Sequence, residues 1–230
     1  GLKFARYADD TVIWSPSYVA ICEAFNIVDA FSRDARVSIN VKKSDGISLL
    51  AKDGLAAEIA SKSSFNFLGY AIGVDRISVR DKTIQRIKKQ VSYLLYRNLV
   101  QPLKSTPLKG LVIPANNRDK ALLIAMMQIR RYLYGGLLHR DMAAYIKGRR
   151  KTLHFKGVMS FYPLLNDVEQ LRALDGWLVS VINRCVQARS RLLMSHGFDR
   201  RHSFPFNVRR QDILAKYRRK RVAGKPLLEV

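Results

Sequence analysis

The chain has 230 residues, of which 48% are hydrophobic, so it is long enough to bury a core, and its composition argues against wholesale disorder. No apolar run approaches the roughly 20 residues that span a bilayer, and no signal-peptide core follows the first residues, so we expect a cytoplasmic protein with no membrane partner. Cys22 and Cys185 lie far apart in a charged chain, which favours reduced thiols, and no Cys-x-x-Cys pair suggests a zinc site.

Positive charge is the strongest feature of the composition. The chain carries 41 lysines and arginines against 18 acidic residues, a formal net charge of +23. Residues 1–80 hold 10 basic and 9 acidic side chains, whereas residues 81–230 hold 31 and 9. A positive field confined to one part of a chain is typical of a polyanion-binding surface. We therefore expect nucleic acid, in preference to an anionic membrane, as the partner of residues 81–230.

Residues 1–50 predict a β-hairpin, a helix and a second hairpin. Residues 2–14 place apolar and β-branched side chains on both sides of the acidic tip Ala8-Asp9-Asp10, as in a tight reversal of two strands. Residues 15–17 favour a helix start, and apolar residues follow at helical spacing. Residues 37–41 alternate apolar and polar side chains, which predicts a strand, and residues 47–50 would form its hairpin partner.

The rest of the chain predicts one more strand pair and then mainly helices. Residues 65–72 form a short strand pair punctuated by glycine, and an amphipathic helix begins at Thr83. Three prolines within residues 101–117 indicate a linker. Residues 118–138 and 168–193 show the apolar spacing of helices. These elements predict three regions, at residues 1–80, 81–117 and 118–230.

Two adjacent carboxylates, Asp9 and Asp10, stand at the tip of the first predicted hairpin. Like charges this close repel each other unless a cation lies between them. Mg²⁺, or Mn²⁺ in its place, resolves the conflict because it takes hard oxygen ligands, typically one or two carboxylates plus substrate phosphates. The alternative interpretation is a simple polar turn, which would be the better choice for an isolated Asp-Asp pair.

The sequence around this pair resembles a known motif. Phe-Ala-Arg-Tyr-Ala-Asp-Asp-Thr-Val-Ile at residues 4–13 resembles motif C of reverse transcriptases, specifically the bacterial group that includes group II intron, retron and phage-defence enzymes. Residues 39–44 resemble motif D, residues 65–70 resemble the primer-grip hairpin of motif E, and the helix from Thr83 takes the place of the first thumb helix. The resemblance implies an α+β fold with an incomplete antiparallel polymerase palm, a helical thumb and a basic helical C-terminal extension.

The resemblance also implies roles for the residues that match these motifs. Asp9 would be the direct metal ligand and Asp10 a weaker ligand or a neighbour of the metal. Lys43 would approach the phosphates of the incoming deoxynucleotide, although Lys42 is a rival one residue away. The residues expected to shape the primer and nucleotide sites are Tyr7, Ala8, Leu68 and Gly69.

One catalytic part of the family pattern is not present in these residues. Polymerases of this family need another aspartate, from motif A, well upstream of motif C, and the chain begins six residues before Tyr7. We therefore expect an RNA-directed DNA polymerase whose active site is completed upstream, with this chain inactive by itself. The alternatives are a non-catalytic, maturase-like RNA-binding protein and a truncated remnant.

The basic residues predict where nucleic acid would be held. Arginine suits phosphate through its two-pronged guanidinium, and interleaved aromatic residues can stack on unpaired bases. The expected partners are an RNA template, a DNA primer and deoxynucleotides, with a structured non-coding RNA as a further option. The resemblance does not separate antiviral defence from a mobile element. The residues expected to contact nucleic acid are Arg86, Lys88, Lys89, Arg130, Arg131, Arg149, Arg150, Lys151, Arg218 and Arg219.

Overall fold

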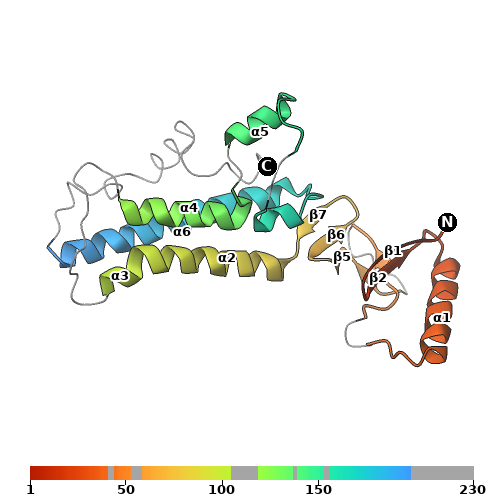
Figure 1. The fold of residues 1–230 in the computed structure, drawn as a ribbon. Coiled ribbons are helices and arrows are strands. Elements are labelled where there is room, and N and C mark those ends of the chain that lie inside the picture. The colour runs from red at the N-terminus through yellow and green to blue at the C-terminus, as the bar shows by residue number, and fades with distance from the viewer. Residues whose placement is uncertain (41–43, 53–58, 105–118, 137–138, 153–155, 198–230) are drawn as a thin grey trace. The chain divides into compact units, whose positions relative to one another are not determined.

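The structure is a computed structural model that describes residues 1–40, 44–52, 59–104, 119–136, 139–152 and 156–197. Its elements divide into two compact units, residues 1–80 and residues 81–230. Helices and small sheets both occur (Figure 1), so the expected α+β class is confirmed. Among the described residues, every helix is too short or too polar to cross a membrane.

The first unit opens with the predicted hairpin. Strands β1 (Lys3–Tyr7) and β2 (Asp10–Trp14) pair antiparallel, and Tyr7 lies opposite Asp10. This register leaves a loop of two residues, Ala8 and Asp9. Ala8 has a φ of 53°, and a positive φ at the first residue is common to the two-residue hairpin loops, types I′ and II′, whose twist suits that of the strands. The predicted hairpin is therefore confirmed.

Helix α1 (Tyr18–Asp34) follows as predicted, but the next predicted strand is wrong. Arg36 adopts a φ of 53°, and the amide of Val37 donates to the carbonyl of Ser32 at 3.0 Å. The Ser32 hydroxyl in turn donates to the carbonyl of Val37. These bonds close the helix C-terminus and occupy the backbone N–H and C=O of Val37, and residues 37–40 form no strand. Val41 lies outside the described residues.

The predicted second hairpin is also wrong. β3 (Leu49–Leu50) pairs in parallel with β4 (Ser61–Lys62), a segment farther along the chain. The amide of Leu49 donates to the carbonyl of Ala60 at 2.8 Å, and the amide of Ala51 donates to Lys62 at 3.0 Å. In the predicted hairpin, the backbone groups of residues 47–50 would have bonded to residues 37–41. In the structure, Leu49 and Ala51 bond to the β4 segment instead.

A three-stranded antiparallel sheet completes the first unit. β5 (Ser64–Phe67) and β6 (Tyr70–Gly73) form the predicted strand pair, and β7 (Ile77–Val79), which the sequence pattern did not predict, pairs with β6. The amide of Arg80 donates to the carbonyl of Gly69 at 3.0 Å, which ties the end of the sheet to the β5–β6 loop.

The apolar surface of the first unit is largely open. Of its described residues, only Ala24 and Val79 are buried apolar side chains. The apolar stripe of α1 is left in solvent, with Phe25 46% and Phe31 69% exposed. A helix gains most of its stability by burying such a face. The apolar face of α1 is therefore open for packing against other structure.

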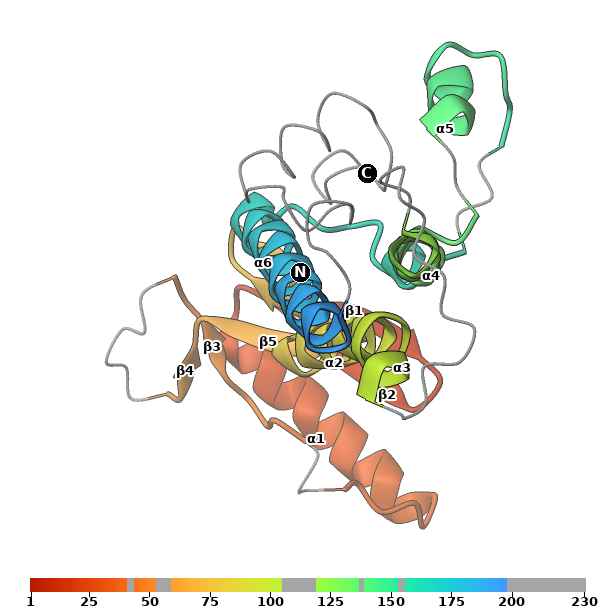
Figure 2. The same ribbon diagram turned by 90° about the vertical axis from the view of Figure 1, so that its left-hand side faces the viewer.

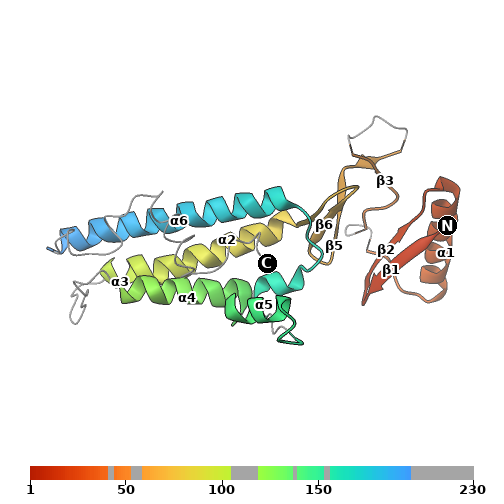
Figure 3. The same ribbon diagram turned by 90° about the horizontal axis from the view of Figure 1, so that it is seen from above.

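The second unit is a helical bundle. α2 (Asp81–Leu95), α4 (Lys120–Tyr134) and α6 (Val168–Ser195) run side by side, as Figures 1 and 3 both show. α2 continues through the π-helix η1 (Tyr96–Val100) into α3 (Gln101–Lys104), while α5 (His139–Ile146) and the 3₁₀ turn η2 (Val158–Phe161) follow α4. Figure 2, which looks along α4, shows α2 and α6 beside it. The buried apolar residues of the bundle include Ile87, Val91, Leu95, Leu99, Leu103, Ala125, Ile129, Leu133, Val186 and Leu193.

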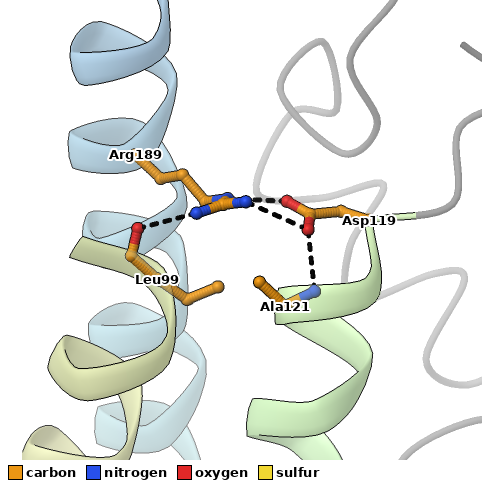
Figure 4. Close-up of polar contacts among 4 residues, drawn as sticks. All are labelled: Leu99, Asp119, Ala121 and Arg189. Carbon is orange, nitrogen blue, oxygen red and sulfur yellow. Dashed lines mark hydrogen bonds and ion pairs between the residues drawn. The ribbon is translucent and has the colours of Figure 1, made fainter. Parts of the chain in front are cut away.

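A buried ion pair joins the helices on the two sides of the proline-containing segment (Figure 4). The Arg189 side chain on α6 is 2% exposed, and its Nε donates to the Asp119 carboxylate at 2.7 Å. Asp119 also caps α4 by accepting from the Ala121 amide at 2.9 Å, and Arg189 Nη1 donates to the Leu99 carbonyl at 3.0 Å. Helices α2 and α4, on either side of residues 101–117, thus belong to one unit.

Candidate catalytic hairpin and nucleic-acid interface

The first candidate site is the tip of the β1–β2 hairpin. Asp9 is the second loop residue and Asp10 begins β2, so both carboxylates stand at the tip, and both are exposed. Tyr7 pairs with Asp10 across the strands, and cross-strand partners point to the same face of a sheet. Arg6 Nε donates to the Ala8 carbonyl at 3.0 Å and holds the loop from the strand before it. The fold therefore brings Tyr7, Ala8, Asp9 and Asp10 together.

Asp9 and Asp10 are suitable ligands for a hard divalent cation, but two carboxylates are too few to complete its coordination. Mg²⁺ takes carboxylate oxygens together with substrate phosphates or water, and an exposed tip leaves room for them. Among the described residues, no group of three or more histidine, cysteine, aspartate or glutamate side chains could hold a metal. Asp9 and Asp10 could therefore hold Mg²⁺ or Mn²⁺ only with ligands from substrate or from other protein residues.

The second candidate site is the loop between β5 and β6, formed by Leu68 and Gly69. Phe67 pairs with Tyr70, so the loop has two residues, and their φ angles are 49° and 87°. Two positive φ angles define a type I′ loop, for which Asn-Gly is the favoured sequence. Leucine is costly at φ 49°, and Leu68 is also 43% exposed. A strained, exposed leucine at a hairpin tip is consistent with selection for contact rather than for stability.

Replacing Leu68 with asparagine is expected to stabilise the β5–β6 hairpin by about 1 kcal/mol, because asparagine tolerates this backbone conformation. The Arg80 amide, which bonds to Gly69, should then exchange with solvent about fivefold more slowly. Leu49→Asn is the matched control, since Leu49 is 44% exposed and has no positive φ. Equal exchange rates in the Leu68 variant and the unaltered chain would show that the loop carries no such strain.

Several predicted site residues cannot be placed. Lys42 and Lys43, expected near the nucleotide phosphates, lie outside the described residues, as do Arg218 and Arg219. The predicted role of Lys43 therefore stays a prediction.

The basic residues of α2 differ in their surroundings. Arg86 and Lys89 are exposed on the side of α2 opposite its buried apolar stripe. Lys88 lies at the edge of that face, with Nζ 5.6 Å from the centre of the Trp177 ring on α6. A cation over an indole is stabilised by the ring, so Lys88 contributes to helix packing as well as to charge. Arg86 and Lys89 are thus the more accessible cations.

The other predicted basic residues form separate groups. On α4, Arg131 is exposed and Arg130 is half-buried. The α5 helix ends at Ile146, and Gly148, with a φ of 67°, closes its C-terminal cap and leads into Arg149, Arg150 and Lys151. All three are exposed, and Arg150 Nη1 forms an ion pair with Asp141 Oδ1 at 2.8 Å. Within the part of the chain that the structure describes, Arg149 and Lys151 form no ion pair.

Three further exposed residues lie along this face of α2 and the start of η1, and the sequence analysis did not identify them. Lys82, Tyr93 and Arg97 continue the row of Arg86 and Lys89 at intervals of three or four residues. Residues at that spacing are neighbours on a helix surface. Applying the helical period to the polar side of this segment, and not only to its apolar side, would have identified them.

Burial affects one tyrosine beside this face. Partial burial raises the pKa of Tyr132 on α4 above its usual value, and the nearby Tyr162 acts in the same direction. The positive charge of Arg86 opposes both by favouring the phenolate. Arg86 on α2 therefore lies close enough to Tyr132 on α4 to act on its pKa.

We also compared the chain with known proteins. No family model, curated protein or solved structure matches it.

Proposed function

We propose that the chain is part of an RNA-directed DNA polymerase, with Asp9 and Asp10 as carboxylates of its catalytic centre. The observation that carries the proposal is the tip of the β1–β2 hairpin, which presents both carboxylates, exposed and adjacent, within a sequence resembling motif C of reverse transcriptases. The proposed partners are an RNA template, a DNA primer and deoxynucleotides.

In the proposed reaction, the primer 3′-hydroxyl loses its proton to water and its oxygen attacks the α-phosphorus of a deoxynucleoside triphosphate. A new phosphorus–oxygen bond forms as the bond from this phosphorus to the β-phosphate breaks, and pyrophosphate leaves. When bound, Mg²⁺ or Mn²⁺ supplies Lewis-acid stabilisation to the attacking and leaving oxygens. Asp9 would hold the metal directly, and Asp10 would assist it. Tyr7, on the same face as Asp10, would support the primer end, and the backbone of Leu68 and Gly69 would contact the primer strand.

The open surface of the first unit supports the idea that other residues complete this centre. The α1 stripe and the hairpin expose large apolar side chains, among them Phe4, Phe25 and Phe31. A palm sheet continued by further strands would cover such side chains and bring another carboxylate beside Asp9. This arrangement would also supply the ligands that Asp9 and Asp10 lack.

Primer extension tests the proposal. The chain, joined to the residues that precede Gly1 in its reading frame, should extend oligo(dT) on poly(A) in the presence of Mg²⁺. Asp9→Asn should reduce incorporation on the order of 100- to 1,000-fold, the size of effect typical of losing one group that stabilises charge in a transition state. Asp75→Asn is the control, because Asp75 is an exposed aspartate of the same unit that bonds to Lys52.

A second function is favoured by the charge of the helical unit. Residues 81–230 carry 31 basic and 9 acidic side chains, which suits a maturase-like RNA-binding protein without catalysis. Under this alternative the joined protein binds RNA but incorporates no deoxynucleotide, and Asp9→Asn leaves its RNA affinity unchanged.

A further inference from the structure

The end of α2 and the π-helix after it expose an aromatic and cationic surface. Tyr93 is 50% and Tyr96 42% exposed, and Arg97 beside them is exposed. Lys104 reaches over this surface from α3, with Nζ 5.5 Å from the centre of the Tyr96 ring. We call these four residues the tyrosine–arginine surface. It contains two accessible rings and two cations within about three turns of helix.

The backbone under this surface is fixed from its buried side. The carbonyl of Leu99, within the π-helix, accepts a bond from Arg189, which is itself held by Asp119 (Figure 4). Asn98 Nδ2 donates to the Leu94 carbonyl at 2.7 Å and to Gln128 Oε1 on α4 at 2.8 Å. A π turn widens a helix and changes the direction of its side chains, and such turns are frequent at functional sites. The helix is thus held in a form that leaves both rings facing solvent.

The charge around the rings favours a polyanion. No acidic residue occurs between Lys82 and Lys104 in the sequence, so the cations of this segment are not offset by acidic residues within it. Phosphates would bond to Arg97 and Lys104, and the face of an unpaired base would stack on a tyrosine ring. A second copy of the chain, with a net charge of +23, would be repelled by the same field.

We propose that the tyrosine–arginine surface binds single-stranded nucleic acid, with unpaired bases stacked on Tyr93 and Tyr96 and the adjoining phosphates held by Arg97 and Lys104. The inference rests on the proposed handling of nucleic acid by this chain and adds a site on the helical unit, separate from the Asp9–Asp10 hairpin. A single strand is specified because the bases of a duplex are already stacked on one another and offer no free face.

Fluorescence anisotropy with the full 230-residue chain and a labelled 12-nucleotide oligo(U) tests the site. Tyr93→Leu and Tyr96→Leu should each raise the Kd about tenfold, whereas Tyr96→Phe, which keeps the ring, should bind nearly as well as the unaltered chain. Tyr145→Leu on α5 is the matched control, since Tyr145 is 47% exposed, and its affinity should not change. Arg97→Gln should weaken binding and reduce the slope of log Kd against log salt by somewhat less than one.

Other outcomes overturn the inference. If Tyr93→Leu and Tyr96→Leu bind oligo(U) as the unaltered chain does, the rings make no contact with bases. If a 12-base-pair RNA duplex shows the same dependence on both tyrosines, the surface does not recognise unpaired bases. If a glutamate-rich peptide displaces oligo(U) at equal concentration and depends on the same tyrosines, the surface binds acidic protein segments instead. Because the binding assay requires no polymerisation, its failure leaves the Asp9 test of polymerase activity unaffected.

Discussion

Replacing Arg189 with methionine is expected to destabilise the helical unit by roughly 3–5 kcal/mol, the cost of leaving one charge of a buried pair without its partner. The substitution removes both bonds to the Asp119 carboxylate, which is buried, and the bond to the Leu99 carbonyl. Urea unfolding followed by Trp177 fluorescence, in a Trp14→Phe background, measures the loss in this unit.

Two further variants separate the ion pair from a general effect of lost charge. Arg191→Met removes an exposed arginine two residues along the same helix and should change stability by no more than about 0.5 kcal/mol. Adding Asp119→Asn to Arg189→Met should recover part of the loss, because asparagine still caps α4 and carries no buried charge. If the two substitutions prove additive, the residues do not act as a coupled pair.

The elements that the sequence predicted correctly have local signals. The β1–β2 and β5–β6 hairpins combine apolar strands with a short polar or glycine-containing tip, and Ser17 caps α1 by accepting from the Ala20 amide. Helices α2, α4 and α6 follow from apolar spacing that matches their buried faces. Each of these features is readable within one or two turns of helix or one strand pair, so periodicity and capping are sufficient to find it.

The features that were missed depend on residues distant in the sequence. Arg189 lies among other basic residues, which suggests a solvated position, and only its approach to Asp119, 70 residues earlier, makes it a core residue. The parallel pairing of β3 with β4 has no turn signal, and the predicted strand at residues 37–40 was overridden by the helix cap at Arg36. The π turn is hidden because Leu95, Leu99 and Leu103 continue an apolar spacing of four residues through it.

The candidate sites divide in the same way. The hairpin tips with Asp9, Asp10, Leu68 and Gly69 were identified from short motifs. The structure places Ala8 and Asp9 in one two-residue loop, with Asp10 as the first residue of β2, and Leu68 and Gly69 in another. The tyrosine–arginine surface was not identified, because Tyr96 and Lys104 lie eight residues apart and their contact is seen only in the folded chain.

Replacing Gly157 with alanine is expected to destabilise the helical unit by about 1–3 kcal/mol, because the added methyl group has no space. A Cβ at this position would lie 2.1 Å from the Leu133 carbonyl oxygen and 2.2 Å from the Tyr134 nitrogen, both backbone atoms at the end of α4. Backbone cannot rotate away as a side chain can, so η2 must move off α4. At roughly 2–4 °C per kcal/mol for a unit of this size, thermal melting should show a clear drop in Tm.

Gly176→Ala provides a control with the opposite expected sign. Gly176 lies within α6, a Cβ there would meet nothing within 4 Å, and alanine favours a helix over glycine by about 1 kcal/mol. A fall in stability for Gly157→Ala beside a rise for Gly176→Ala would identify the contact between η2 and α4 as the cause. Equal stability of the Gly157 variant and the unaltered chain would mean that η2 shifts at no cost.

The Gly157 and Arg189 variants should also differ in their effect on nucleic-acid binding. Gly157 contacts the C-terminal turn of α4, whereas Arg189 bonds to Asp119 at the N-terminus of α4 and to Leu99 in the π-helix. A helix of 15 residues separates these two ends by about 22 Å. At a temperature where both variants remain folded, Arg189→Met should therefore weaken oligo(U) binding through Tyr96 and Arg97, while Gly157→Ala should leave it nearly unchanged. Equal losses of affinity would indicate that any destabilisation of the bundle weakens binding. The Arg189 bonds would then have no specific effect on the conformation of the π turn.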